Sequence, residues 1–336
     1  MRLLVLGGTW FIGHAVAAAA VEAGWDVTVF HRGRTGSPPD GVETILGDRT
    51  FAADVRRLAQ RGRWDVVADT SGYVPRNVLA VAQTLERVTE TYVFMSTVSV
   101  YEGWPSTPLT DDSPTLFCPS DAGSDFGEDI EDGPTRYGYQ KSGCERAVLE
   151  TFGTDHAALL RPGVVLGPRE YVGRLPWWLR RVAGGGRAVA PGDPRRVIQP
   201  VDVRDLASFT LTCAKEGNRG SFNVTSQRKD TFGGMLDACA AATGVRPEFV
   251  WVPDEVLLRL GVRQWSELPL WRIHDGVWRV DASRAAAAGL FCRPIADTVL
   301  DTWEWMSSSG AASDNERASE IGLSRKRERF VLEAIS

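Results

Sequence analysis

The chain contains no run of about 20 apolar residues, so its sequence predicts no membrane span. It also lacks a positive charge balance: 43 Asp and Glu against 38 Lys and Arg give a net charge of −5, which argues against a nucleic-acid or anionic-membrane partner. The five cysteines are scattered and form no CxxC pair, which excludes the usual zinc and disulfide patterns. We therefore expect a cytoplasmic protein with reduced thiols and no bound metal.

Short runs rich in β-branched residues alternate with helical patterns through the first half of the chain, as in a parallel sheet wound with helices. Strands are expected at Arg2–Leu6, Asp26–Phe30, Val42–Leu46, Asp65–Ala68, Thr91–Met95, Ala157–Leu160 and Gly220–Val224. Helices are expected at His14–Ala23, Asp54–Arg61, Val78–Leu85, Tyr137–Phe152 and Ser324–Ile335. The predicted fold class is α/β, a Rossmann-type doubly wound parallel sheet with a smaller C-terminal substrate-binding lobe.

The alternation becomes irregular after about residue 166, where glycine and proline clusters indicate loops. We expect a nucleotide-binding domain in residues 1–165, joined by a return segment at about 195–225. Residues 166–194 and 226–309 would form the substrate-binding lobe. Residues 310–336 would hold a linker, begun by the small polar stretch Ser307–Asn315, and a charged terminal helix.

The first predicted strand leads directly into GGTWFIG, Gly7 to Gly13. Gly7 and Gly13 have the spacing of the outer glycines in a dinucleotide-binding turn, while Trp10 stands in place of the middle glycine. A helix N-terminus after such a turn offers unpaired N–H groups to a pyrophosphate. The alternative is a tight turn with a purely structural role; the strand before it and the small-residue helix after it favour the cofactor interpretation.

A second motif, Tyr137-Gly-Tyr-Gln-Lys141, puts a phenol and an ammonium four residues apart on one helix face. A neighbouring ammonium favours the phenolate and brings the phenol's pKa toward neutrality, as acid–base catalysis requires. Tyr139 has no lysine four residues after it and cannot take the same role. The competing interpretation is an ordinary tyrosine on an amphipathic helix.

Three further segments accompany these motifs: the hydroxyl-bearing strand end FMSTVSVY (Phe94–Tyr101), LRPGVVLGP, which begins at Leu160, and VDVRDLA, which begins at Val201. With these motifs in their order along the chain, residues 1–305 resemble the extended short-chain dehydrogenase/reductases, the NAD(P)-dependent epimerase/dehydratase family. Trp10 makes the turn similar to the atypical GGTxFxG branch, which includes the chloroplast stem-loop-binding proteins.

The resemblance implies that Thr97 binds the substrate carbonyl or alcohol, that Tyr137 is the acid–base, and that Lys141 binds the nicotinamide ribose and tunes the tyrosine. It implies cofactor contacts from Gly7, Thr9, Trp10, Phe11, Ile12, Gly13, Arg32, Asp48, Arg49, Ser71, Tyr137, Lys141 and Val164. Substrate contacts are expected from Ser99 and Arg196. Members of this family commonly dimerise through the helix that carries the tyrosine and the helix before it, so we expect a homodimer.

The residues at the end of the second predicted strand, Phe30-His31-Arg32, bear on whether the cofactor is NAD(H) or NADP(H). An NAD enzyme would commonly have a carboxylate there on the ribose 2′-hydroxyl. Here Arg32, with Arg34 nearby, is suited to a 2′-phosphate, which favours NADP(H) over NAD(H). The alternative is that both arginines are simply solvated.

Departures from the family pattern bear on the reaction. Val98 and Ser99 stand where 4,6-dehydratases have an Asp-Glu pair, so that chemistry is not expected. Val164 and Ile198 stand where sugar-nucleotide epimerases usually have an asparagine and a diphosphate-binding arginine, although Arg195 and Arg196 are close enough to compensate. We expect an NAD(P)-dependent oxidoreductase acting on the carbonyl/alcohol pair of a small molecule. The alternatives are a sugar-nucleotide epimerase that works through a transient ketone, and a non-catalytic nucleotide-sensing or RNA-binding protein.

The chain has 12 tryptophans, several of them in its second half. They suggest a pocket for an apolar-faced substrate. Its expected lining is Trp104, Tyr171, Trp177, Trp178 and Trp271.

Overall fold

The computed structural model describes residues 1–309 and 320–335, and the chain divides into two compact units. Unit 1 comprises Met1–Val164, Val203–Gln227 and Asp275–Phe291. Unit 2 comprises Val165–Asp202, Arg228–His274 and Cys292–Ser336. The sequence predicts Asp275–Phe291 as part of the second lobe. The segment belongs to unit 1 because its backbone bonds to Leu109, whose N–H donates to Arg279 O at 2.9 Å and whose carbonyl accepts from Asp281 N at 2.8 Å.

Unit 1 is built on a seven-stranded sheet in which every neighbouring pair is parallel, with the order β10-β6-β5-β4-β1-β2-β3. The strands are β1 (Arg2–Leu6), β2 (Asp26–His31), β3 (Glu43–Leu46), β4 (Trp64–Asp69), β5 (Thr89–Met95), β6 (Ala157–Pro162) and β10 (Gly220–Val224). All seven predicted strands are present, and the predicted α/β doubly wound fold is confirmed. Several predicted helices begin too late: α1 (Phe11–Glu22) starts three residues before His14, directly after the glycine turn.

The strand order changes direction at β1, which lies between β2 and β4. At such a switch point the loops after the two adjacent strands diverge to opposite faces, and a crevice opens beyond their carboxyl ends. In this chain the loop after β1 is the glycine turn and the loop after β4 begins at Thr70, so the fold places these two loops side by side.

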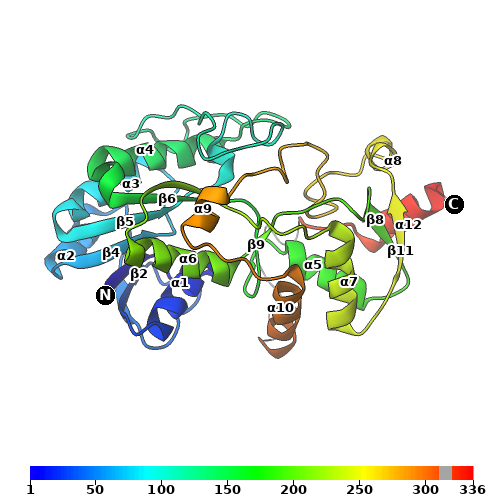
Figure 1. Ribbon diagram of the computed structural model, residues 1–336, viewed down its shortest axis with the longest axis horizontal. Helices are drawn as coiled ribbons and strands as arrows, with labels where there is room; N and C mark the ends of the chain where they lie inside the picture. The colour runs from blue at the N-terminus through cyan, green and yellow to red at the C-terminus, as the bar shows by residue number, and fades with distance from the viewer. Residues whose placement is uncertain (310–319, 336) are drawn as a thin grey trace. The chain divides into compact units, whose positions relative to one another are not determined.

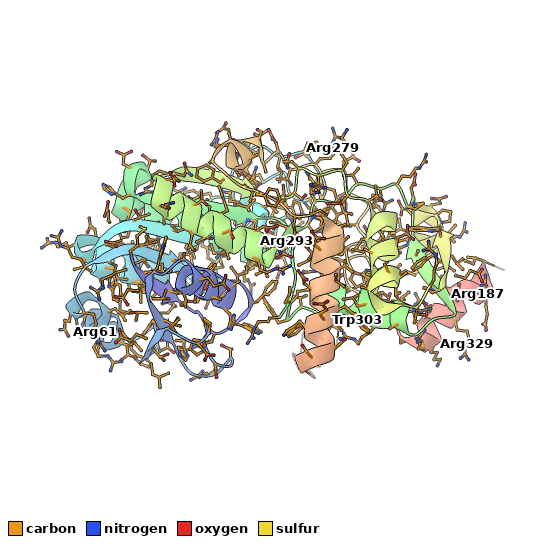
Figure 2. All side chains as sticks on the ribbon, turned by 60° about the horizontal axis from the view of Figure 1, so that its bottom comes forward. Arg61, Arg187, Arg279, Arg293, Trp303 and Arg329 are labelled. Carbon is orange, nitrogen blue, oxygen red and sulfur yellow. The ribbon has the colours of Figure 1, made fainter. Side chains whose placement is uncertain are left out.

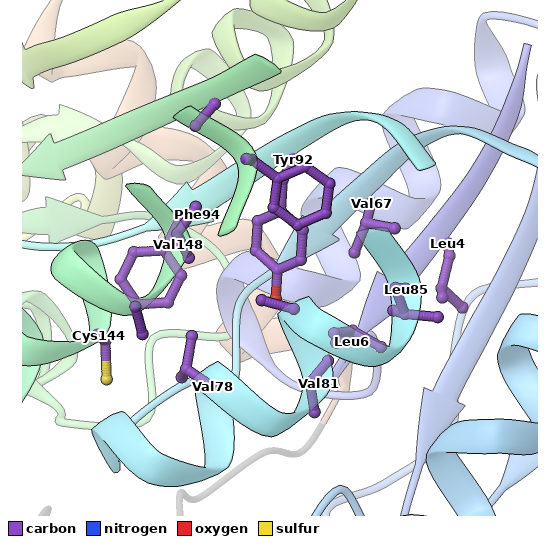
Figure 3. Close-up of a cluster of buried hydrophobic side chains, with 14 of the residues drawn as sticks. Leu4, Leu6, Val67, Val78, Val81, Leu85, Tyr92, Phe94, Cys144 and Val148 are labelled. Carbon is purple, nitrogen blue, oxygen red and sulfur yellow. The ribbon is translucent and has the colours of Figure 1, made fainter. Parts of the chain in front are cut away.

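Helices cover both faces of this sheet (Figure 1). On one face α1 packs against α6 (Val203–Glu216), and on the other α3 (Pro75–Leu85) packs against α2 (Ala52–Gln60) and α4 (Arg136–His156). The short elements η1 (Glu86–Val88), η2 (Val98–Val100) and α9 (Ser283–Ala287) complete the unit. Beneath α3 and α4 lies a buried cluster that includes Leu4, Val67, Val81, Tyr92 and Val148 (Figure 3). The sheet and α4, which carry the predicted catalytic residues, therefore share one apolar core.

Unit 2 contains two small parallel pairs of strands and five described helices. β7 (Val165–Leu166) pairs with β9 (Val201–Asp202), and β8 (Arg187–Pro191) pairs with β11 (Glu248–Val252). The helices α5 (Arg174–Ala183), α7 (Phe232–Thr243) and α10 (Ile295–Ser309) pack together, and α8 (Asp254–Arg259) and α12 (Arg325–Ala334) complete the unit.

The C-terminal helix is held to unit 2 by a buried ion pair. Glu328 of α12 accepts Arg181 Nε at 2.7 and 2.9 Å and Val189 N at 3.1 Å, so the predicted terminal helix is an integral part of this unit. The linker predicted at Ser307–Asn315 is wrong at its start, because α10 continues to Ser309, and the rest of it lies outside the described residues.

Surface cations of both units stand next to carboxylates. Arg61 lies 3.0 Å from Glu43 in unit 1, and Arg187 lies 3.5 Å from Glu248 in unit 2 (Figure 2).

All five cysteines are free thiols. Within residues 1–309 and 320–335, no helix combines the length and the apolar character needed to cross a bilayer.

Candidate functional site

The glycine turn is compact because two of its positions exclude any side chain. Gly7 has φ +96°, in the left-handed region, and a Cβ on it would lie 2.7 Å from the Cβ of Ser71. A Cβ on Gly13 would lie 2.3 Å from the carbonyl oxygen of Gly7, so this glycine lets α1 approach the end of β1. These are the two tasks of the outer glycines in a dinucleotide-binding turn.

Trp10 does not block the turn in the way its position in the motif would suggest. It is the N-cap residue of α1, has extended φ and ψ of −130° and 150°, and its side chain is 38% exposed. The helix begins without a side-chain cap from this residue. The first turn of α1 therefore fits an anion such as a pyrophosphate, since the helix dipole favours negative charge there.

A buried ion pair between Asp69 and Arg49 holds the loop after β4 in place. Asp69 accepts both terminal nitrogens of Arg49, at 2.7 and 2.8 Å, the phenol of Tyr92 at 2.8 Å and the N–H of Ser71 at 3.1 Å. Burial, the largest single effect, would raise the pKa of Asp69, but the charge and hydrogen bonds of Arg49, the hydrogen bond from Tyr92 and the charge of Lys141 together outweigh it and lower the pKa. Both ionised side chains thus serve to hold the Ser71 loop against β1.

This pairing changes the role expected for Arg49. Its guanidinium is committed to Asp69 and also donates to Ser71 Oγ at 3.2 Å. Asp48 is also engaged locally, because its Oδ1 accepts the N–H of Thr50 at 3.0 Å and the Thr50 hydroxyl at 2.9 Å. Both residues follow β3, at the carboxyl ends of the strands.

The segment after β2 carries the two cations predicted to select the cofactor. Arg32 and Arg34 are exposed and follow the last residue of β2, His31. The segment is tied to the glycine turn through Thr35, whose hydroxyl lies 2.8 Å from that of Thr9. The cations therefore lie on a loop that is bonded directly to the predicted pyrophosphate site.

Thr97 and Ser99 follow the end of β5. Thr97 caps η2: its hydroxyl oxygen accepts the N–H of Ser99 at 3.1 Å and its O–H donates to Ser99 Oγ at 3.3 Å. Both the structural role, as a cap, and the predicted role, as a hydroxyl beside the substrate, fit this position. Val164, the predicted cofactor contact after β6, is buried at the last position of the unit's first segment.

Lys141 is buried, with 3% of its surface exposed. Its Nζ donates to Gly72 O at 2.9 Å and, by a short contact, to Met95 O, so it joins the loop after β4 to the end of β5. The ring of Phe94 lies 4.2 Å from the ammonium. Burial lowers the pKa of Lys141 from 10.5 to about 8.

Tyr137 is one helical turn before Lys141 on α4 and is 44% exposed. Thr135 caps this helix by accepting the N–H of Gly138 at 3.2 Å, which starts α4 at the residue before the tyrosine. The ring of Tyr137 lies 6.4 Å from that of Tyr73, which the sequence analysis did not select. A reactant above the carboxyl ends of the strands could therefore reach the phenol.

A second buried network joins α4 to the strands. Glu145, four residues after Lys141, accepts the hydroxyl of Ser96 and both Nε and Nη2 of Arg161, at 2.8 and 2.6 Å. Arg161 Nη1 in turn donates to Tyr101 OH at 2.9 Å. Because Ser96 precedes Thr97, this network sets the end of β5 against the helix that carries Tyr137 and Lys141.

Every predicted catalytic and cofactor residue lies in unit 1, whereas the predicted substrate contact Arg196 lies in unit 2. Arg196 forms a close ion pair with Asp254, and its Nη1 is buried without a hydrogen-bond partner. The proposed tryptophan pocket is wrong for Trp178 and Trp271. Both are fully buried in unit 2, and their N–H groups donate to Pro269 O and Asp254 Oδ1.

With the geometry established, comparisons with known proteins decide the family. The model of the "NAD dependent epimerase/dehydratase family" matches residues 3–225. The chain belongs to this family. It is an enzyme-family member with the nicotinamide-binding Rossmann fold that the glycine turn indicated.

Two curated proteins are similar in sequence. The chloroplast stem-loop binding protein of 41 kDa b from Arabidopsis thaliana is 28% identical over 269 residues, 74% of this chain and 65% of that protein. The chain thus spans somewhat less than two thirds of that relative's length. The UDP-glucose 4-epimerase of Corynebacterium glutamicum is 29% identical over 133 residues, 34% of this chain and 40% of the epimerase.

Among solved structures, the Bordetella bronchiseptica enzyme WbmG in complex with NAD has the same fold, with a TM-score of 0.69 and 19% identity over 92% of this chain and 95% of WbmG. Its agreement with the present chain supports the architecture of the sheet and its surrounding helices.

Proposed function

We propose that the protein is an NAD(P)-dependent oxidoreductase that interconverts a carbonyl and an alcohol in a small molecule. One observation carries this proposal. The buried ammonium of Lys141 is bonded to the loop after β4 and to the last residue of β5, one helical turn from an exposed phenol and at the carboxyl ends of two adjacent strands. A lysine with only a structural role would join these segments at a high cost in stability, because a buried charge must be fully compensated by its contacts.

The residues of unit 1 fit a nicotinamide dinucleotide. The first turn of α1 would hold the pyrophosphate, Ser71 would border the ribose, and Lys141 would hold the nicotinamide ribose. When bound, the nicotinamide ring supplies or accepts the hydride.

The protein's own groups would manage the proton. In reduction, Tyr137 gives its phenolic proton to the carbonyl oxygen as that oxygen gains charge, and in oxidation it removes the alcohol's proton. The positive charge of Lys141 stabilises the phenolate that forms. The hydroxyl of Thr97, at the end of β5, would orient the reacting oxygen by a hydrogen bond.

For the cofactor we favour NADP(H) over NAD(H). Arg32 and Arg34 are exposed on a loop bonded to the glycine turn, where a 2′-phosphate would gain charge-assisted hydrogen bonds. WbmG was solved with NAD, so NADH is the required comparison in every assay.

A sugar-nucleotide epimerase is the second candidate. It is favoured by the similarity to a UDP-glucose 4-epimerase. In this reaction the same Tyr137 and Lys141 would act twice, and the hydride would return to the opposite face of the sugar.

The two candidates differ in cofactor turnover. The protein is to be incubated with NADPH or NADH and a panel of ketones and keto-sugar nucleotides, and followed at the nicotinamide absorbance band. UDP-glucose and UDP-galactose are to be tested separately by product chromatography. Net oxidation of NADPH supports the oxidoreductase, and interconversion without net oxidation supports the epimerase. Absence of both, with binding of a stem-loop RNA, would replace them by the non-catalytic alternative.

We also propose a cytoplasmic homodimer that forms through α3 and α4. Phe117, 64% exposed and covered on one side by the guanidinium of Arg146 of α4, is an apolar group that a partner would bury. Light scattering at micromolar concentration should give the mass of two chains; the mass of one chain would withdraw the proposal.

A further inference from the structure

The aromatic side chain of Tyr73 lies against both residues of the proposed acid–base pair. Its ring centroid is 6.4 Å from that of Tyr137, with an interplanar angle of 40°, and 5.3 Å from Nζ of Lys141. The same ammonium lies 4.2 Å from the ring centroid of Phe94. Two aromatic rings thus lie near Lys141, one in the core and one, Tyr73, that is 51% exposed.

The backbone that carries Tyr73 is held firmly. Ser71 donates its N–H to Asp69 at 3.1 Å, and its hydroxyl accepts Arg49 Nη1 at 3.2 Å. A Cβ on Gly72 would lie 2.7 Å from the ring of Phe94, so this part of the loop is packed directly on the core. Gly72 also accepts the ammonium of Lys141, which ties the loop to α4. These contacts fix the backbone from which the side chain of Tyr73 extends.

We propose that Tyr73 is a positioning residue, whose ring face holds the Lys141 ammonium in line with the Tyr137 phenol. The proposal rests on the proposed function for the task of the ammonium, but the contact itself can be measured without turnover. A cation is attracted to the negative face of an aromatic ring, and the ring also keeps water away from it. Two of the three ammonium protons go to Gly72 O and Met95 O, which leaves one for the phenol or the ribose.

Two substitutions distinguish the attraction of the Lys141 ammonium to the ring face of Tyr73 from simple shielding of Lys141 by an apolar side chain. Tyr73→Phe keeps the ring and removes the hydroxyl. Tyr73→Leu keeps an apolar cover over Lys141 and removes the ring face, so burial still disfavours the ammonium but the attraction is lost. The pKa of Lys141 should therefore stay the same in the first variant and fall in the second.

Other charged groups around Lys141 are common to the parent and both variants. Asp69 lies on β4 and Arg49 follows β3, while Cys144 and Glu145 belong to the same helix as the lysine. Tyr137 remains in place as well. A difference between the two Tyr73 variants therefore reports on the ring.

The first readout is the pKa of Lys141, followed by NMR of the lysine side chains in cofactor-free protein. We expect Tyr73→Phe to match the parent and Tyr73→Leu to lower the pKa by about half a unit. Phe117→Leu is the matched control, because it removes the ring beneath Arg146, 4.9 Å away, and touches neither Tyr137 nor Lys141 in any described contact. It should leave the Lys141 pKa unchanged.

The second readout is the pH profile of kcat with cofactor and a substrate found in the screen above. In Tyr73→Leu the alkaline limb should move to lower pH by the same half unit, with kcat reduced about 3- to 10-fold, while Tyr73→Phe keeps the parent profile. A purely structural role would lower the melting temperature of Tyr73→Leu without moving either titration.

Identical Lys141 pKa values in the parent and in both Tyr73 variants would overturn the proposal. So would a Tyr73→Phe protein that behaves like Tyr73→Leu, because the hydroxyl rather than the ring would then matter. A parent protein with no turnover on any substrate would refute the proposed function instead, and the NMR titration would still decide the role of Tyr73.

Discussion

Replacing Lys141 by methionine gives a quantitative test of the buried ammonium. Burial lowers the pKa of this lysine from 10.5 to about 8, whereas in the unfolded chain it titrates near its ordinary value. Between about pH 8 and 10.5 the unfolded state therefore binds more protons than the folded state, and stability must rise with pH. At about 1.36 kcal/mol for each pKa unit, the whole gain is about 3 kcal/mol.

The cost of the buried charge is fully present below pH 8 and disappears as the pH rises through this window. Lys141→Met has a side chain of similar length and no charge, so it lacks this titration. It leaves Gly72 O and Met95 O without their donor, which lowers its stability by an amount that does not depend on pH. The unfolding free energy of the parent, measured relative to that of Lys141→Met, should therefore rise by about 2–3 kcal/mol between pH 7 and 10.5.

The assay is urea denaturation of both cofactor-free proteins at several pH values, with the slope m compared to confirm that the same surface unfolds. Taking the difference between the two proteins cancels the titration of all other groups. Lys215→Met, which changes an exposed lysine of α6, is the matched control and should run parallel to the parent. Parallel curves for Lys141→Met as well would refute the buried ammonium.

Three further substitutions test the parts of the site. Glu145→Gln removes the charge that pairs with buried Arg161 and should lower the unfolding free energy by about 3 kcal/mol, whereas exposed Glu150→Gln should change it by less than about 0.5 kcal/mol; equal effects would refute the network's role. Trp10→Glu adds a negative charge at the start of α1 and should weaken cofactor binding about tenfold or more while leaving the melting temperature the same or higher, and undiminished binding would exclude this turn as the pyrophosphate site. Arg32→Ala should remove most of a preference for NADPH worth about 1.5–3 kcal/mol and leave NADH affinity unchanged, and a parent that binds both equally would show that the arginine is solvated.

The sheet and the two motifs could be predicted because their signals are local. A strand followed by GGTWFIG, and a tyrosine four residues before a lysine, need only their neighbours in sequence. The effect of a substitution in the glycine turn could not be predicted from the sequence alone. Gly13→Val disturbs the fold itself, because a Cβ there meets the carbonyl oxygen of Gly7 at 2.3 Å. Trp10→Glu is the better probe for this reason.

Residues that act through tertiary contacts gave no signal in the sequence. Asp69 pairs with Arg49, 20 residues earlier, and with Tyr92, 23 residues later, only because β3, β4 and β5 end at the same edge of the sheet. Tyr73 was missed because nothing in its neighbourhood predicts that Lys141 will reach its ring. Trp178 was misassigned to a pocket because composition cannot distinguish a tryptophan in a wall from one in a core.

The central claim is that Tyr137 moves the proton in a hydride-transfer reaction, and Tyr137→Phe tests it most directly. The measurement is a single turnover of bound NADPH with a substrate from the screen, beside the cofactor's dissociation constant. Tyr139→Phe, on the same helix without a lysine four residues later, is the control and should keep the parent rate. We predict that Tyr137→Phe binds NADPH with an affinity within about threefold of the parent and transfers hydride about 10²–10⁴-fold more slowly, the usual contribution of a positioned acid–base. A Tyr137→Phe protein that turns over at the parent rate would contradict the account and leave the Tyr137–Lys141 motif with a structural role.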